Sequence, residues 1–209
     1  ILLIQNKALE LSLFLSLPAS IALLIGSEQI ISALFGYGQF DQTSVYNAAK
    51  ALFFFSLGLP AFAMIKIFSS FFFANHDTKT PFYISLVSVF LNIIISVYYF
   101  NLIGFIIIPI ATTVSSWFNV FALFILLKKK KLFEFNRIFI LRFFKITFSS
   151  ILMGVFFNYL IFIFEDQLAF NYLFKSFYLI LSVFLGLCFY LVTSLWIKAF
   201  QLKDINLKY

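Results

Sequence analysis

Charged side chains are scarce in this sequence. Asp, Glu, Lys and Arg make up 11% of its 209 residues, whereas a soluble domain carries about 25% charged residues. This scarcity excludes an ordinary soluble globular domain. Apolar residues make up 63% of the chain and fall mostly in long runs, and a helix needs about 20 such residues to cross a bilayer. The sequence therefore predicts an all-α integral membrane protein.

Cysteine and histidine are almost absent, which limits the chemistry available to the chain. The single cysteine, Cys188, falls within an apolar run, so a disulfide framework and a Cys-rich metal site are excluded. The single histidine, His76, stands in a polar turn without a cysteine beside it. No glycine-rich nucleotide loop, HExxH motif or nucleophile elbow occurs. We therefore expect no metal site, no cofactor and no catalytic residue, and we interpret the chain as a non-enzyme.

Six transmembrane helices are predicted from the apolar runs. The third and fourth runs are nearly continuous, and Asn101 and Gly104 supply the break between them. The predicted spans are Leu11–Phe35, Asn47–Phe73, Phe82–Phe100, Phe105–Leu127, Ile138–Phe164 and Tyr172–Ile197.

Basic residues orient these spans. They follow the second, fourth and sixth spans, whereas the opposite loops carry acidic residues or no charge. Since short cytoplasmic loops collect Lys and Arg, both ends of the chain are predicted to be cytoplasmic, and the net charge of +7 needs no nucleic-acid partner. We interpret the run of four lysines as a topology signal, with contact to anionic lipid headgroups as the alternative. The basic residues of these loops and of the tail are Lys79, Lys128–Lys131, Arg137, Lys198, Lys203 and Lys208, with Arg142 and Lys145 close behind Arg137, and the acidic ones are Asp41, Glu165 and Asp166.

Polar side chains form one stripe on the third span and another on the fourth. Such stripes either line an aqueous cavity or form hydrogen bonds between helices. Each stripe alone favours packing, but two striped helices next to each other favour a cavity. The third span carries Ser85, Ser88, Asn92 and Ser96, and the fourth carries Thr112, Ser115, Ser116 and Asn119. We therefore take as candidates for a substrate pathway Ser85, Ser88, Asn92, Thr112, Ser116 and Asn119.

Lys66 is a further candidate because it lies inside the second span, where an ionisable side chain is costly. Two interpretations stay open. The side chain either extends to the interface along its apolar stem, or it faces a central cavity and meets an anionic group of a substrate. Three other charged residues, Glu28, Lys50 and Lys175, stand near the outer ends of spans and are expected at the membrane interface.

A polar turn is predicted between the second and third spans, from Asn75 to Pro81. Asp77 and Thr80 suit the cap of the following helix. Pro81 stands in the first turn of that helix, where proline is tolerated. These three residues are assigned a structural role that requires no substrate.

Several segments of the chain resemble the MurJ (MviN) family of lipid II flippases. The likeness covers about residues 5–131, and the turn from Asp77 to Pro81 is fairly specific within it. Residues 138–209 match mainly as two further apolar helices. The segments that carry the resemblance are Leu17–Ala19, Leu34–Asp41, Gly58–Phe62 with Lys66, Phe72–Ala74, Asp77–Pro81, Asn92, Gly104–Asn119 and Lys128.

The resemblance implies a fold and a division of the chain. Members of this family, within the multidrug/oligosaccharidyl-lipid/polysaccharide exporter superfamily, have fourteen spans, and this chain would hold spans nine to fourteen. Residues 1–131 would then form four spans of the second transport lobe, and residues 132–209 two additional helices. We expect the sequence to be a fragment, because it begins with Ile1 at a span. Its missing N-terminal lobe would be a partner supplied by the same protein.

The resemblance also implies a function, which is transport of undecaprenyl-linked peptidoglycan precursor across the bacterial cytoplasmic (inner) membrane by alternating access. The partners would be this lipid-linked precursor and membrane lipid, and the last two helices would contact the lipid tail. Lys66 stands at a position shared with the family, while the family's cationic cavity residues lie largely outside this chain. The alternatives are an exporter of another polyprenyl-linked polysaccharide unit or of a drug, and a membrane scaffold without transport activity.

Overall fold

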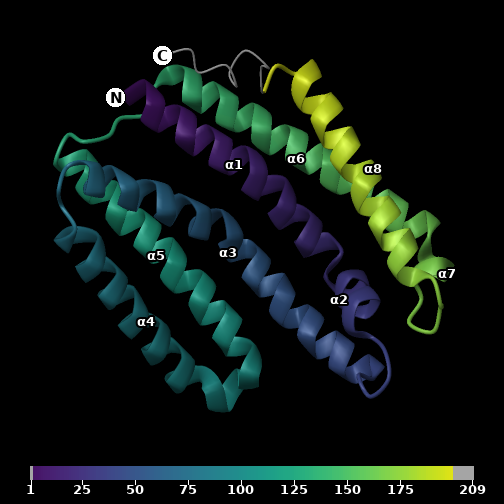
Figure 1. Cartoon of the computed structure of the whole chain (residues 1–209). Coiled ribbons are helices and arrows are strands. Elements are labelled where there is room, and N and C mark those ends of the chain that lie inside the picture. The colour runs from purple at the N-terminus through teal and green to yellow at the C-terminus, as the bar shows by residue number, and fades with distance from the viewer. Residues whose placement is uncertain (1, 200–209) are drawn as a thin grey trace. The chain divides into compact units, whose positions relative to one another are not determined.

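The computed structural model describes residues 2–199, and every regular element in that range is a helix (Figure 1). The predicted all-α membrane fold is therefore confirmed. The basic residues Lys203 and Lys208 lie outside the described residues. The elements are α1 (Leu2–Ile25), α2 (Ser27–Phe35), α3 (Gln42–Ala74), α4 (Lys79–Ile103), the 3-10 turn η1 (Gly104–Ile106), α5 (Ile107–Lys129), α6 (Arg137–Ile163), α7 (Glu165–Leu168) and α8 (Lys175–Trp196).

Five helical stretches within residues 2–199 are long and apolar enough to cross a membrane. They are Ile4–Ile25, Gln42–Ala74, Lys79–Lys129, Arg137–Ile163 and Lys175–Trp196. The third stretch has 51 residues and contains α4, η1 and α5. A straight helix of that length would measure about 76 Å at 1.5 Å per residue, more than twice the hydrocarbon thickness of roughly 30 Å. Instead the chain turns at Gly104, and α4 and α5 pack side by side (Figure 1). The count of six crossings stays a prediction.

The first predicted span, Leu11–Phe35, has the wrong limits. The helix already begins at Leu2 and ends at Ile25, and residues 27–35 form the separate helix α2. Hydropathy misplaced the start because α1 opens with polar residues whose side chains are nevertheless buried, namely Gln5, Asn6 and Glu10. The Asn6 amide donates to the Glu134 carbonyl at 2.9 Å and accepts from the Asn136 N–H at 3.2 Å. These bonds to the α5–α6 connection explain why a polar residue is stable in this helix.

The described residues form two compact units, which are residues 2–16 with 54–139 and residues 17–53 with 140–199. This packing division does not test the predicted division of the chain at residue 131, which stays a prediction. The first unit contains α4, η1 and α5, and the second contains α2, α7 and α8.

Aromatic side chains fill the core of the first unit. Phe68 and Phe71 of α3 meet Phe133, which follows α5, with ring centroids 5.8 and 5.4 Å apart. All three side chains are buried. The short connection after α5 is thereby packed against the end of α3, and large buried rings of this kind stabilise a fold strongly.

Pro60 lies inside α3, and α5 supplies hydrogen bonds beside it. Proline lacks the N–H that would bond the carbonyl four residues earlier, which weakens the local helix ladder. On the same stretch of α3, Thr113 Oγ1 donates to the Phe54 carbonyl at 2.7 Å, and Trp117 Nε1 donates to the Leu57 carbonyl at 3.1 Å. Polar side chains of α5 thus bond the backbone of α3 near its proline.

Close backbone approach characterises the second unit. A Cβ atom at Gly154 of α6 would lie 2.5 Å from Cγ2 of Ile21, and one at Gly26 would lie 2.8 Å from the Phe157 ring. Such contacts leave no room for a methyl group. Small residues therefore set the distance between α1 and α6 here, as small residues commonly do between membrane helices.

Candidate functional site

The two predicted polar stripes face each other between α4 and α5. The Asn92 amide donates to Thr112 Oγ1 at 3.0 Å and to Ser115 Oγ at 3.4 Å. One turn along α4, Ser96 Oγ donates to Asn92 Oδ1 at 3.5 Å. Towards the other end of the pair, the Asn119 amide donates to Ser85 Oγ at 3.4 Å. We call Ser85, Ser88, Asn92, Ser96, Thr112, Ser115, Ser116 and Asn119 the polar seam.

Other members of the polar seam bond within their own helix. Ser88 Oγ donates to the Ile84 carbonyl at 2.8 Å, and Ser116 Oγ donates to the Thr112 carbonyl at 2.7 Å. Ser88, Ser116 and Asn119 are buried, and Asn119 Oδ1 has no hydrogen-bond partner among the described residues. The sequence left two roles open for the stripes, an aqueous cavity or hydrogen bonds between helices, and the seam does contain such hydrogen bonds. A role in a substrate pathway stays a prediction.

Lys66 lies on the exposed surface of α3. Its ammonium makes no hydrogen bond or ion pair with any residue of the part of the chain that the structure describes. The side chain is therefore available to lipid headgroups, to solvent or to an anionic substrate. The choice between a snorkelling lysine and a substrate contact stays open.

The turn after α3 has the geometry of a Schellman motif. The Asp77 N–H donates to the Phe72 carbonyl and the His76 N–H donates to the Phe73 carbonyl, both at 3.0 Å. His76 adopts the left-handed conformation, with φ of 58°, which this motif requires at that position. The single histidine thus has a local conformational role. The Asn75 amide adds a bond to the Phe71 carbonyl at 2.8 Å.

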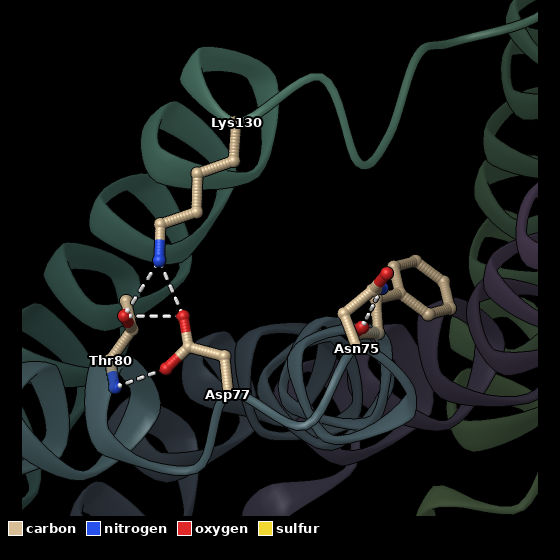
Figure 2. Close-up of polar contacts among 5 residues, drawn as sticks. Asn75, Asp77, Thr80 and Lys130 are labelled. Atoms are coloured by element: carbon tan, nitrogen blue, oxygen red, sulfur yellow. Dashed lines mark hydrogen bonds and ion pairs between the residues drawn. The ribbon is translucent and has the colours of Figure 1, made fainter.

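Asp77 joins this turn to the end of α5, as Figure 2 shows. Its carboxylate accepts the Thr80 N–H at 3.0 Å and the Thr80 hydroxyl at 2.7 Å. Lys130 forms an ion pair with the same carboxylate and donates to Thr80 Oγ1 at 3.1 Å. Hydrogen bonds from Lys130 and then Thr80 hold the pKa of Asp77 well below its usual range. Pro81 is buried and is the third residue of α4.

Lys175 is buried, contrary to the expectation from the sequence. It was expected at the membrane interface, but its side chain is only 1% exposed. The ammonium donates to the carbonyls of Gly36 and Phe170 at 2.7 and 2.8 Å, and it lies 4.4 Å from the Tyr37 ring centroid. Carbonyl oxygens and aromatic faces replace its water shell. No local sequence signal reveals this, because the groups that surround Lys175 come from distant parts of the chain.

Structural zinc sites draw on four His or Cys side chains. No group of three or more His, Cys, Asp or Glu side chains is placed to hold an ion in residues 2–199. The lone Cys188 is half-buried and carries a free thiol.

A sequence model of the family described as lipid II flippase MurJ matches residues 1–184. The chain belongs to the MurJ lipid II flippase family. Curated MurJ relatives include the probable lipid II flippase MurJ of Thermotoga maritima, which is 32% identical over 194 residues, covering 93% of this chain and 37% of that protein. The corresponding proteins of Rhizobium meliloti and Rickettsia prowazekii are 40% and 38% identical, over 58% and 56% of this chain and 23% of each relative.

A solved MurJ structure has the same fold. It is described as lipid II flippase MurJ in an inward closed conformation, and it superposes with a TM-score of 0.72 at 26% identity. The match covers 91% of this chain and 37% of the solved chain. The chain thus spans between about a quarter and somewhat over a third of the length of the MurJ proteins it matches. The five long apolar helical stretches within residues 2–199, together with the family, make it a multi-pass membrane protein.

The Asp77 ion pair gives a pH-dependent contribution to stability. Because the pKa of Asp77 is lowered on folding, the contribution is complete above the unfolded carboxyl pKa of about 3.9 and is lost as pH falls through the lower folded value. We expect the melting temperature of Asp77→Asn to lie below that of the parent by a constant amount above about pH 5. The difference should shrink below about pH 4. The melting temperatures can be measured on detergent-solubilised protein. A difference between variant and parent that already disappears near neutral pH would contradict a stabilising role of the Asp77 carboxylate.

Replacement of Asn92 tests the polar seam. Asn92→Leu removes the bonds to Thr112 and Ser115, and an interhelical hydrogen bond in a membrane contributes about 0.6 kcal/mol on average, with a maximum near 1.7. We expect this substitution to lower the free energy of unfolding by an amount within that range. The matched control is Asn158→Leu, which alters an exposed amide on α6. Equal effects of both substitutions would show that the seam contributes no specific stability.

Proposed function

We propose that this chain is part of a transporter, not an enzyme, that moves undecaprenyl-linked peptidoglycan precursor (lipid II) from the inner to the outer leaflet of the bacterial inner membrane. The observation that carries the proposal is the MurJ family match over residues 1–184. The similarity to a solved MurJ flippase over 91% of the chain supports it. Flipping requires two lobes around a cavity, so the N-terminal lobe of the same protein is the necessary partner.

The surface chemistry of α6 suits a lipid-linked substrate. Large apolar side chains are exposed at intervals along the helix, including Phe144, Phe148, Ile151 and Val155. Exposed apolar area of this extent is unfavourable in water and favourable against acyl or prenyl chains. Residues 132–209 would therefore supply the contact with the lipid tail, and residues 1–131 would belong to the second transport lobe.

We also propose a topology for the chain. Six crossings, with α4 and α5 counted separately, would place both ends of the chain in the cytoplasm. The exposed lysines at 79, 128, 129 and 131 support this orientation, since Lys and Arg concentrate in short cytoplasmic loops. The Asp77–Lys130 ion pair would then lie on the cytoplasmic side. There it would tie the α3–α4 turn to the end of α5.

Lys66 and the polar seam are the candidates for the route of the polar headgroup. An ammonium that no described residue neutralises is suited to the pyrophosphate of the substrate. Ser85, Asn92, Ser96 and Thr112 of the seam are only half-buried, and their amide and hydroxyl groups would meet the sugars and the peptide. Ser85, Ser88, Asn92, Thr112, Ser116 and Asn119 would serve the route directly or by fixing α4 against α5.

Depletion of the whole protein in its host tests the function. We expect lipid II to accumulate in the inner leaflet and cells to lyse, because cell-wall synthesis on the outer face loses its precursor. The measurement is the fraction of lipid II that a membrane-impermeant reagent reaches in intact cells. An unchanged fraction would contradict lipid II transport. Accumulation of a different polyprenyl-linked sugar would assign the chain to another exporter.

Two substitutions distinguish the interpretations of Lys66. If the ammonium meets an anionic substrate, Lys66→Met should reduce transport at least about tenfold, the effect of losing roughly 1.4 kcal/mol, and Lys66→Arg should retain most of it. If Lys66 only extends to the interface, both variants should transport normally. Lys79→Met is the matched control, because Lys79 is also exposed and stands outside the span of α3. The readout is the rate of lipid II transport at equal protein level.

A further inference from the structure

The second unit contains a cavity of about 280 Å³ between α2, the start of α3, the end of α6, α7 and the loop that follows. Its polar lining comes from Glu28, Gln29, Ser32, Gln42 and Glu165. Glu28, Gln42 and Glu165 are exposed, whereas Ser32 is buried. The cavity is therefore open on one side and closed at its inner end. The polar seam and Lys66 belong to the other unit, and none of these residues lines the cavity.

The side-chain donors of this cavity are all suited to a cation. Two carboxylates, two amide oxygens and a hydroxyl line it, and no basic side chain does. Neither Glu28 nor Glu165 forms an ion pair with another described residue. Oxygen donors of this kind are the ligands of hard cations such as Mg²⁺ and Ca²⁺.

Ser32 provides an independent indication of a ligand. Its side chain is 5% exposed, and its Oγ has no hydrogen-bond partner among residues 4–199. Buried hydroxyl groups are nearly always bonded to protein or to ordered water. Because Ser32 forms part of the cavity wall, a ligand in the cavity would supply the missing hydrogen bond. This ligand would be an ion or a water molecule bound to that ion.

The size of the cavity indicates that such an ion would keep part of its water. A volume of about 280 Å³ far exceeds the ~30 Å³ of one water molecule. The described residues also lack a group of three or more acidic, His or Cys side chains that could enclose a bare ion. Mg²⁺ commonly keeps several waters and is bound through one or two carboxylates. Two carboxylates in a roomy cavity match that mode.

Lys175 fixes the wall of this cavity without occupying it. Its buried ammonium bonds the carbonyls of Gly36 and Phe170, and Phe170 lines the cavity. The loop after α2 is thereby joined to the loop before α8. The positive charge of Lys175 is surrounded by carbonyls and by the rings of Tyr37 and Phe170. It therefore leaves both carboxylates available to a ligand.

We propose that this cavity binds one partly hydrated divalent cation, with Glu28 and Glu165 as its charged ligands and Ser32 in contact with its hydration shell. No local sequence pattern reveals this site, because Glu28 and Glu165 are far apart in the chain. The proposal is independent of lipid transport, since it concerns binding of an ion to the folded protein.

Mn²⁺ is a suitable probe, because it takes Mg²⁺ sites and its free form is counted by electron paramagnetic resonance. We expect the whole protein, purified in detergent, to bind one Mn²⁺ that Mg²⁺ displaces. Glu28→Gln and Glu165→Gln should each weaken binding by at least about tenfold, the lower end of the effect seen even for residues that only support a metal ligand. Ser32→Ala should weaken it less, because the hydroxyl carries no charge.

Asp166→Asn is the matched control, since Asp166 is an exposed acid next to Glu165 that does not line the cavity. It should bind Mn²⁺ like the parent. Melting curves recorded without metal show whether each variant is folded. Absence of Mn²⁺ binding in the parent would overturn the proposal. Unchanged binding in folded Glu28→Gln and Glu165→Gln, an equal loss in Asp166→Asn, or displacement by a simple alkylammonium ion as readily as by Mg²⁺ would also overturn it.

Discussion

Hydrocarbon offers no hydrogen bonds, so the backbone polar groups of a membrane span must find partners within the protein, and an unpaired polar side chain is costly there. The contacts between helices of this chain follow from that constraint. Asn92 on α4 meets Thr112 and Ser115 on α5. Thr113 and Trp117 of the same helix bond the backbone of α3 close to Pro60. Helix α5 is thus held on two sides by polar groups that lipid could not satisfy.

The same constraint shapes the connections between helices. At the end of α3, a Schellman turn and the Asp77 carboxylate satisfy backbone groups that the helix ends would otherwise leave free. In the second unit, Lys175 and Ser176 at the start of α8 bond the carbonyls of Gly36 and Ala33. Each unit is therefore fixed locally by a few specific bonds. Large apolar side chains remain exposed along α6, as expected of a protein that is surrounded by lipid.

The sequence predicted the helices well where hydrophobic runs have clear ends. Gly104 separates α4 from α5 as expected, and α3 and α6 lie within a few residues of their predicted limits. The start of α1 was missed because Gln5, Asn6 and Glu10 look like loop residues until their burial is known. Gly26 ended this helix earlier than its apolar surroundings indicated, because its backbone leaves the helical conformation there.

The candidate site was predictable only where its residues are close in sequence. The cap formed by Asp77 and Thr80 follows from a spacing of three residues, whereas the ion pair of Asp77 with Lys130 depends on the packing of α5. The periodicity of Ser85, Asn92, Thr112 and Asn119 identified two polar faces, and the structure shows that they meet. The burial of Lys175 depends on loops far from it in the chain, which no local pattern contains.

Reconstitution tests most directly whether this chain is part of a lipid II flippase. The whole protein would be placed in vesicles that contain lipid II in both leaflets, and a membrane-impermeant reagent would be added outside. If the protein transports lipid II, the reagent should come to react with nearly all of it, because molecules of the inner leaflet continue to reach the outer one. If the reaction stops at the fraction initially in the outer leaflet, as in vesicles without protein, the assignment of lipid II transport is wrong.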